Sequence, residues 1–135
     1  MTTTTTAIAN EQLVRQFFAS FGSPEKDKTT MRSMCSADFL WENSGLPPVR
    51  GHDAACAMID AWAAQLDFAS LAIEMLHLAA DGDTVLCERV DTFYNSKGET
   101  LFKLDIMGRL KIQAGKIVAY RDYFDPTEIA HKFAS

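Results

Sequence analysis

The sequence has few cysteines and no long hydrophobic run. Its three cysteines, Cys35, Cys56 and Cys87, are an odd number without a CxxC spacing, and each lies among apolar neighbours. This pattern predicts reduced core thiols rather than a disulfide framework. No apolar stretch approaches the roughly 18 residues of a membrane span, and the threonine run from Met1 to Thr6 lacks the basic and apolar regions of a secretion signal. We therefore expect a cytoplasmic protein that does not insert into a membrane.

A positively charged surface is also missing. Thirteen lysine and arginine residues stand against eighteen acidic residues, which gives a formal net charge of -5, and the basic residues are scattered along the chain. Nucleic acid and anionic membranes are therefore not expected as partners. His52, His77 and His131 lie in different contexts without the spacing of metal ligands, so no metal site is predicted.

The apolar content is sufficient for one domain. The 135 residues are 47% hydrophobic, which fits a single core. We expect residues 1–9 to form a disordered tail and residues 10–135 to form one domain. Helices are predicted to begin at Asn10, at Ser23-Pro24 and at Gly51-His52-Asp53, with Asn10, Ser23 and Asp53 as their caps.

After the third helix the hydrophobic pattern changes to the period of a strand. Turn residues such as Ala80-Asp81-Gly82-Asp83 and Asn95-Ser96-Lys97-Gly98 separate the strand-like stretches and are typical of hairpins. The expected strands are 39–43, 70–78, 84–94, 100–112 and 116–125, followed by a short helix over 126–133. Helices first and an antiparallel meander last is the α+β pattern.

Two of these strands carry charged residues on an otherwise apolar face. Because strand side chains alternate between faces, Arg89 and Asp91 share one face, and Asp122 shares a face with Tyr120 and Phe124. A buried carboxylate needs a cationic partner, and Arg89 is the candidate that alternation supplies. The planar guanidinium can hold one carboxylate on each side if Asp122 lies nearby. The pattern therefore predicts an Asp-Arg-Asp bridge inside an apolar pocket.

Two interpretations of this cluster stay open. It can be a structural ion-pair network that fixes the strand register. Alternatively it is catalytic, because two carboxylates around one arginine cannot share equivalent environments, so that one acts as an acid and the other as a base. Asn43, just before the proline-containing turn at Gly45-Leu46-Pro47-Pro48, can help to hold a water molecule, although an asparagine there is also typical of local backbone hydrogen bonding.

The segments that carry these charges resemble the limonene-1,2-epoxide hydrolase family. The similarity lies in Glu88-Arg89-Val90-Asp91, in Gly115-Lys116-Ile117 and in Tyr120-Arg121-Asp122-Tyr123-Phe124-Asp125, and it extends more weakly through Trp41 to Gly51. It implies the cone shared with nuclear transport factor 2 (NTF2), ketosteroid isomerases and SnoaL-like polyketide cyclases. In that α+β cone a strongly curved, mostly antiparallel sheet carries three helices from the N-terminal half on its concave side. A homodimer paired through the outer sheet face is also implied.

The resemblance also implies a role for each residue of the cluster. Asp122 would be the general base that removes a proton from water, Asp91 the general acid that protonates the epoxide oxygen, and Arg89 the bridge between them. No metal, organic cofactor or covalent enzyme intermediate is implied. Asn43 matches a residue that positions the water, whereas Trp41 stands where the family has a tyrosine. An indole only donates a hydrogen bond, so Trp41 can satisfy one lone pair of the water but cannot accept its hydrogen.

The substrate that the resemblance implies is a small hydrophobic epoxide, which water opens to a vicinal diol. The expected apolar lining is Phe68, Phe93, Leu104, Ile106, Phe124, Met31 and Met34, although each of these taken alone is an ordinary core residue. Two other functions stay open. One is a ketosteroid isomerase-like or polyketide cyclase-like enzyme that transfers a proton without consuming water. The other is a small-molecule-binding module without catalytic activity.

Overall fold

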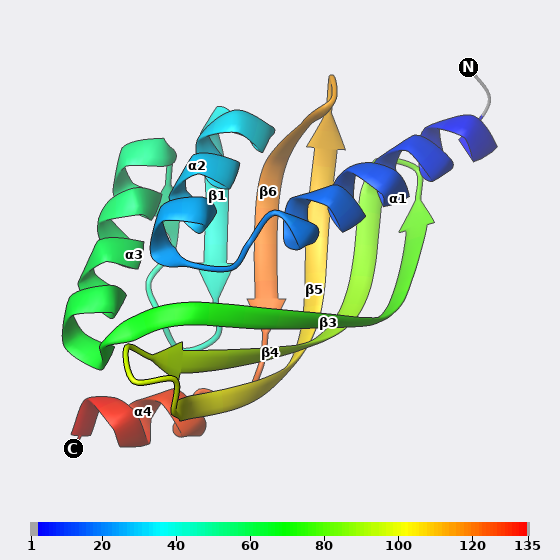
Figure 1. The fold of residues 1–135 in the computed structure, drawn as a ribbon. Helices are drawn as coiled ribbons and strands as arrows, with labels where there is room; N and C mark the ends of the chain where they lie inside the picture. The colour runs from blue at the N-terminus through cyan, green and yellow to red at the C-terminus, as the bar shows by residue number, and fades with distance from the viewer. Residues whose placement is uncertain (1–2, 135) are drawn as a thin grey trace.

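The computed structural model describes residues 3–134 (Figure 1). Its elements are α1 (Thr3–Ala19), α2 (Pro24–Met34), β1 (Cys35–Asn43), β2 (Val49–Arg50), α3 (His52–Leu66), β3 (Phe68–Asp81), β4 (Thr84–Asn95), β5 (Thr100–Gln113), β6 (Lys116–Tyr123) and α4 (Thr127–Ala134). The predicted α+β organisation, with helices first and a meander last, is confirmed. None of the helices within residues 3–134 combines the length and the apolar character that a membrane crossing requires.

The strands form one six-stranded sheet in the order β2-β1-β6-β5-β4-β3. β3 to β6 are an antiparallel meander, as the turn residues predicted. β1 joins the other side of β6 in parallel, with Trp41 beside Tyr120 and Asn43 beside Asp122. This long-range pairing places the first strand of the chain next to the last one.

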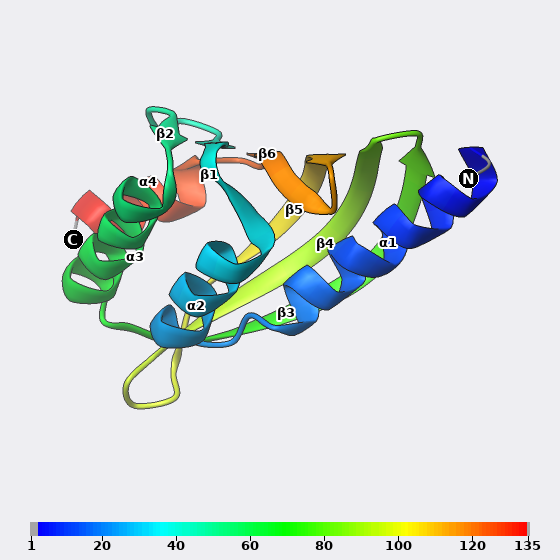
Figure 2. The ribbon, with the colours of Figure 1, turned by 90° about the horizontal axis from the view of Figure 1, so that it is seen from above.

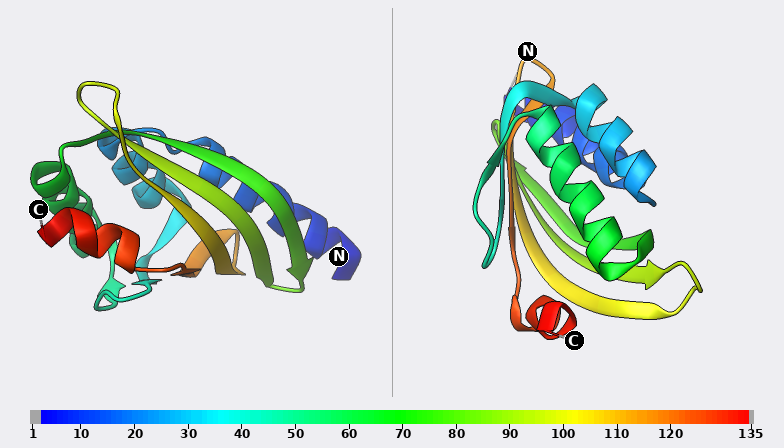
Figure 3. Two further views of the ribbon diagram at one scale, coloured as in Figure 1. Left: turned by 90° about the horizontal axis from the view of Figure 1, so that it is seen from below. Right: turned by 90° about the vertical axis from the view of Figure 1, so that its left-hand side faces the viewer.

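The sheet is strongly curved, and helices cover its concave face. Figures 2 and 3 show α1, α2 and α3 lying inside the bend, while α4 sits at one end of the sheet near β5. β5 alternates between buried and exposed residues, and its buried residues are Phe102, Leu104, Ile106, Gly108, Leu110 and Ile112. The main apolar core lies between this concave face and the helices, and a second cluster of Phe102, Leu104 and Ile106 lies toward α4. A concave sheet closed by helices leaves space for one pocket between the two layers.

The start of α1 differs from the sequence prediction. α1 begins at Thr3 and not at Asn10, so residues 3–9 are helical; no proline or glycine interrupts them, and extending a helix is far easier than nucleating one. Asn10 is not a cap; its side-chain amide instead donates to the Gly82 carbonyl at 2.9 Å and ties α1 to the β3–β4 turn.

Of the caps predicted for α2 and α3, one is present and one is not. Ser23 caps α2 as expected, since its hydroxyl accepts from the Lys26 amide at 3.2 Å. Asp53 does not cap α3. Gly51 occupies that position with a φ of +86°, which favours glycine, and Asp53 forms an ion pair with Arg32 at 3.1 Å instead.

Candidate active site

Arg89 lies at the centre of the charged cluster and is fully buried on the concave face of β4. Its guanidinium donates from Nε and Nη2 to the two carboxylate oxygens of Asp91, at 3.2 and 3.0 Å. It also donates from Nη1 and Nη2 to the two oxygens of Asp122, at 2.9 and 2.8 Å. One arginine therefore holds both carboxylates through two hydrogen bonds each. This is the Asp-Arg-Asp arrangement that strand parity predicted.

The cluster joins β4, which carries Arg89 and Asp91, to β6, which carries Asp122. The strand between them, β5, contributes a glycine at this point. Gly108 pairs with Cys87 of β4 on one side and with Asp122 of β6 on the other. A Cβ atom at Gly108 would lie 2.8 Å from Arg89 Nη1 and 3.0 Å from Asp122 Oδ1. The missing side chain is thus what lets Arg89 reach across β5 to Asp122.

Burial sets the proton affinity of the cluster. Asp91 and Asp122 are 5% and 4% exposed. Burial raises the pKa of Asp91, Arg89 counteracts the rise only in part, and the negative charge of Asp122 adds to it. The Arg89 guanidinium stays charged, because the two carboxylates outweigh the effect of its own burial and hold its pKa well above the usual value. Its flat face also packs on Phe18, with Cζ 4.1 Å from the ring centre.

Asp91 and Asp122 open onto an apolar pocket between the sheet and the helices. Six of the predicted lining residues are present there, namely Phe68, Phe93, Leu104, Ile106, Phe124 and Met31. The prediction for Met34 is wrong, because this residue does not line the pocket. It is half-buried and packs against the main core. Met31 and Met34 lie one helical turn apart on α2, and only the first points at the pocket. Lining residues that the sequence analysis missed include Phe21, Asp27, Ile59, Trp62, Leu66, Leu71, Phe102 and Tyr120.

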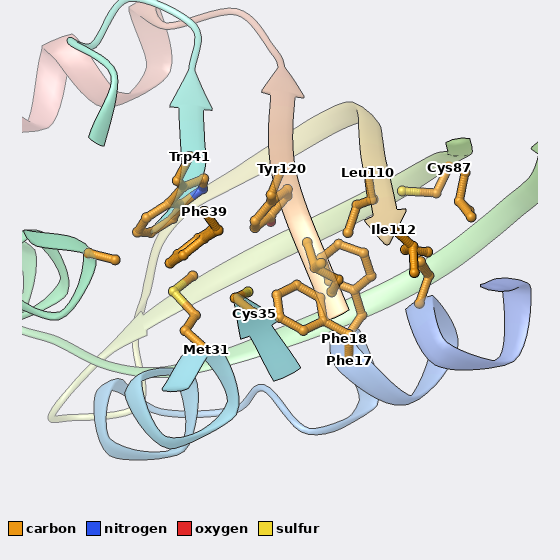
Figure 4. Close-up of a cluster of buried hydrophobic side chains, with 14 of the residues drawn as sticks. Phe17, Phe18, Met31, Cys35, Phe39, Trp41, Cys87, Leu110, Ile112 and Tyr120 are labelled. Atoms are coloured by element: carbon orange, nitrogen blue, oxygen red, sulfur yellow. The ribbon is translucent and has the colours of Figure 1, made fainter. Parts of the chain in front are cut away.

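β1 forms the wall of the pocket next to Asp122. The parallel register with β6 puts Asn43 directly beside Asp122, and both residues line the pocket. Trp41 stacks on Tyr120, with ring centres 5.9 Å apart and planes inclined by 14°, and packs edge-on against Trp62. Figure 4 shows the neighbouring Trp41 and Tyr120 side chains projecting from β1 and β6. Among residues 3–134, Trp41 Nε1 is buried without a hydrogen-bond partner.

Comparison with known proteins assigns the family. The sequence profile of the limonene-1,2-epoxide hydrolase catalytic domain matches residues 8–134, which is nearly the whole chain. The chain belongs to the limonene-1,2-epoxide hydrolase family. The resemblance seen in the charged segments is therefore confirmed over the full fold.

Individual relatives are more distant. The chain is 26% identical over 100 residues to epoxide hydrolase EphG of Mycobacterium tuberculosis, an alignment that covers 74% of this chain and 64% of that protein. The chain thus spans less than two thirds of this relative's length. The structure of an LEH-like epoxide hydrolase of M. tuberculosis has a TM-score of 0.73 and 22% identity, with 95% of this chain and 86% of that chain covered.

The fold is also shared beyond epoxide hydrolases. A structure described as a putative SnoaL-like polyketide cyclase from Jannaschia sp. CCS1 has a TM-score of 0.78 at 14% identity and covers 96% of this chain and 94% of its own. The predicted NTF2-like cone is therefore confirmed. At these identities the structural likeness defines the fold, and the chemistry has to be argued from the residues of the site.

Two polar groups in this family member's pocket were not singled out from sequence. Tyr120, with 3% exposure, donates its hydroxyl hydrogen to Asp122 Oδ2 at 2.8 Å. Asp27, in the first turns of α2, is 4% exposed and accepts the Gly22 amide at 3.0 Å. Burial raises the pKa of Asp27 to about 6, against the backbone hydrogen bonds that lower it. Tyr120 was visible as an inward-facing residue, whereas Asp27 looked like an ordinary surface charge of a helix start.

Within the part of the chain that the structure describes, no group of three or more histidine, cysteine or acidic side chains is placed to bind a metal ion. His52 lies away from the cluster and contacts the Cys35 carbonyl through Nε2 at 2.9 Å, and His77 lies 3.8 Å from Glu88 on the surface. The side chain of His131 lies outside the described residues.

Proposed function

We propose that this protein is an epoxide hydrolase that adds water directly to a small hydrophobic epoxide and releases a vicinal diol. The observation that carries the proposal is the buried bridge of Asp91, Arg89 and Asp122 at the wall of an apolar pocket. The apolar pocket can hold the hydrocarbon skeleton of the substrate. The bridge supplies an acid for the epoxide oxygen and a base for the attacking water.

Asp122 is the base in this proposal. A carboxylate has about four acceptor positions, and Asp122 uses three of them for Arg89 and Tyr120. The remaining position can accept a hydrogen from water held beside it by the Asn43 amide. Trp41, which packs on the same wall, contributes its indole ring and no acceptor.

Asp91 is the acid, because the direction of its pKa favours the protonated form. As the water oxygen bonds to an epoxide carbon, the carbon–oxygen bond of the ring breaks, Asp122 takes the proton of the water and Asp91 gives its proton to the departing oxygen. The cluster holds one proton before and after the step, so its net charge does not change. This is favourable in a buried site, where an additional charge is strongly opposed. Phe68, Phe93, Leu104, Ile106, Phe124 and Met31 would surround the skeleton of the substrate.

The experiment is diol formation from a panel of terpene, styrene and alkyl epoxides in water labelled with heavy oxygen. We expect the label in the diol after a single turnover, and a loss of at least about 100-fold in Asp122→Asn and Asp91→Asn. Asp105→Asn is the matched control, since Asp105 is exposed on the opposite face of β5 and should leave the rate unchanged. A folded protein that forms no diol from any epoxide would contradict the proposal.

A proton-transfer isomerase or cyclase is the second candidate, and Asp27 is the observation that favours it. Asp27 is a buried carboxyl in the same pocket, and none of the ion pairs formed by the described residues involves it. Such a group can act as a base without first separating from an arginine. Exchange of the α-hydrogen of an apolar ketone in deuterated water, lost in Asp27→Asn and retained in Asp122→Asn, would support this candidate over the hydrolase.

We also propose that the protein is cytoplasmic and forms a homodimer through the outer face of the sheet. That face exposes Leu86, Met107 and Tyr123 from three adjacent strands, at 49%, 52% and 45%. Exposed apolar groups that gather on one face are typical of an interface. Sedimentation equilibrium should give twice the chain mass of 15.0 kDa, and Met107→Glu should lower it toward that of one chain.

A further inference from the structure

We infer that Tyr120 makes the two aspartates unequal, by holding Asp122 as the base and directing one of its two oxygens to the water. This inference rests on the proposed hydrolase and adds a positioning residue to it. Its starting point is a near-symmetry: the same guanidinium gives two hydrogen bonds to Asp91 and two to Asp122. The symmetry is broken by a fifth hydrogen bond, from the Tyr120 hydroxyl to Asp122 Oδ2 at 2.8 Å.

The direction of this hydrogen bond follows from the neighbours of the phenol. Arg89 Nη2 lies 3.4 Å from the Tyr120 oxygen, but its two hydrogens serve Asp91 and Asp122 and it has no acceptor for the phenol hydrogen. The hydroxyl hydrogen is then free for Asp122. Burial raises the pKa of Tyr120 well above its usual value, so the phenol keeps this hydrogen over the whole working range of pH. Tyr120 is consequently a permanent donor to Asp122.

This donor distinguishes the two oxygens of Asp122. Oδ2 accepts from both Arg89 and Tyr120, which occupies its two lone pairs, while Oδ1 accepts from Arg89 alone. The vacant acceptor position is therefore on Oδ1, and this oxygen takes the proton of the water. A donor to a carboxylate also favours its charged form, which is the form a base requires.

The packing of the Tyr120 ring explains why the phenol stays in place. Its ring meets Phe17 and Phe18 edge-on, with centres 5.6 and 5.7 Å away, and stacks on Trp41 on the β1 side. The parallel pairing of β1 with β6 sets Trp41 directly beside Tyr120. Trp41 thus acts on the base through Tyr120, as the flat surface that fixes the phenol ring.

The test compares Tyr120→Phe with the wild type by the pH dependence of kcat/KM. Losing a hydrogen bond to a charged carboxylate should move the acidic limb of the profile upward by about one pH unit and lower kcat roughly tenfold. Tyr94→Phe is the matched control: it makes the same change on β4, on the face opposite Asp91 and outside the pocket lining, and should leave both quantities unchanged. A lower rate with an acidic limb in its original place would mean that Tyr120 is only a packing residue, and would overturn the inference.

The charged and titratable groups near Asp122 are Arg89, Asp91 and Cys87 from β4 and Tyr120 from β6, with Asp27 of α2 in the same pocket. A second readout separates Asp122 from the others without any substrate: a carbon-13 NMR titration of assigned aspartate carboxyl groups. We expect the Asp122 signal to titrate at higher pH in Tyr120→Phe and the Asp27 signal to keep its midpoint. If no epoxide is hydrolysed, the proposed function fails, while this titration still decides the inference; an unchanged Asp122 midpoint would refute it.

Discussion

Asp27 is a buried acid whose charge should lower the stability of the protein at neutral pH. It is 4% exposed, and its described contacts are with the backbone at the α1–α2 connection, where it accepts the Gly22 amide. Burial is the main cause that raises its pKa, and the negative charge of Asp91 adds to the rise. The perturbation we consider is Asp27→Asn, which removes the charge but keeps an oxygen for the Gly22 amide.

The magnitude follows from the pKa. The value rises from 3.8 to about 6 on folding, and this difference corresponds to about 3 kcal/mol. Because the folded state binds the proton more tightly, the free energy of unfolding should fall as the pH rises from about 4 to about 6, and remain lower above that range. Below pH 4 both states are protonated and the penalty disappears. Asparagine has no charge to bury, so it should gain most of this energy at pH 8, about 2 kcal/mol after some loss in hydrogen bonding.

The assay is urea unfolding of the wild type and Asp27→Asn at pH 4 and pH 8. We expect similar stabilities at pH 4 and a more stable variant at pH 8, with unchanged m values, because the same surface is exposed on unfolding. Asp105→Asn serves as the control for removing an exposed acid. A variant that is equally or less stable than the wild type at pH 8 would refute the reasoning, since it would mean that the Asp27 carboxylate is well solvated or well paired.

Three further results are expected. Gly108→Ala places a Cβ atom 2.8 Å from Arg89 Nη1; it should lower stability in urea by about 1–3 kcal/mol and abolish most diol formation, whereas a fully active variant would contradict the close packing described here. Arg89→Met leaves two carboxylates without their cation, so thermal unfolding should show a loss of about 3–5 kcal/mol at pH 7 that is smaller at pH 4, and equal losses at both pH values would argue against charge as the cause. Burial raises the pKa of Cys35 to about 12, so a disulfide reagent at pH 8 should not react with this thiol until urea unfolds the protein; rapid reaction of the native thiol would contradict its burial.

Local patterns were sufficient to predict the sheet meander and the pairing of its charges. In β4 and β5 the two faces differ sharply, so alternation alone placed Arg89 and Asp91 inside, opposite Ile106 and Leu104. A charge on an apolar face needs a partner, and this physical requirement linked Arg89 to Asp122 across 33 residues. The prediction succeeded where the period of the backbone and the cost of an unpaired charge act together.

The features that were missed depend on contacts between distant segments. The local sequence pattern does not predict that β1 pairs with β6 in parallel. This pairing places Asn43 beside Asp122 and Trp41 beside Tyr120. Asp27 shows the same difficulty, because an acid in the first turns of a helix is usually solvated and stabilises the helix end. Asp27 is buried because α2 packs against strands that follow it in the sequence, and the local pattern around Asp27 does not reveal this packing. The prediction for Met34 was wrong for a simpler reason. Met34 lies one helical turn after Met31, and this turn is enough to move a side chain from the pocket to the core.

The structural and the catalytic interpretations of the Asp91–Arg89–Asp122 cluster require the same proton. With both carboxylates ionised, the buried group would carry one uncompensated negative charge, which the apolar surroundings of Arg89 strongly oppose. The raised pKa of Asp91 shows how the fold avoids this charge, because a proton on Asp91 makes the cluster neutral. That proton is the one an epoxide oxygen would need when its ring opens. The additional Tyr120 donor favours ionised Asp122 and leaves the proton on Asp91. The unequal hydrogen bonding of the two aspartates therefore gives each of them the protonation state that the proposed acid–base chemistry needs.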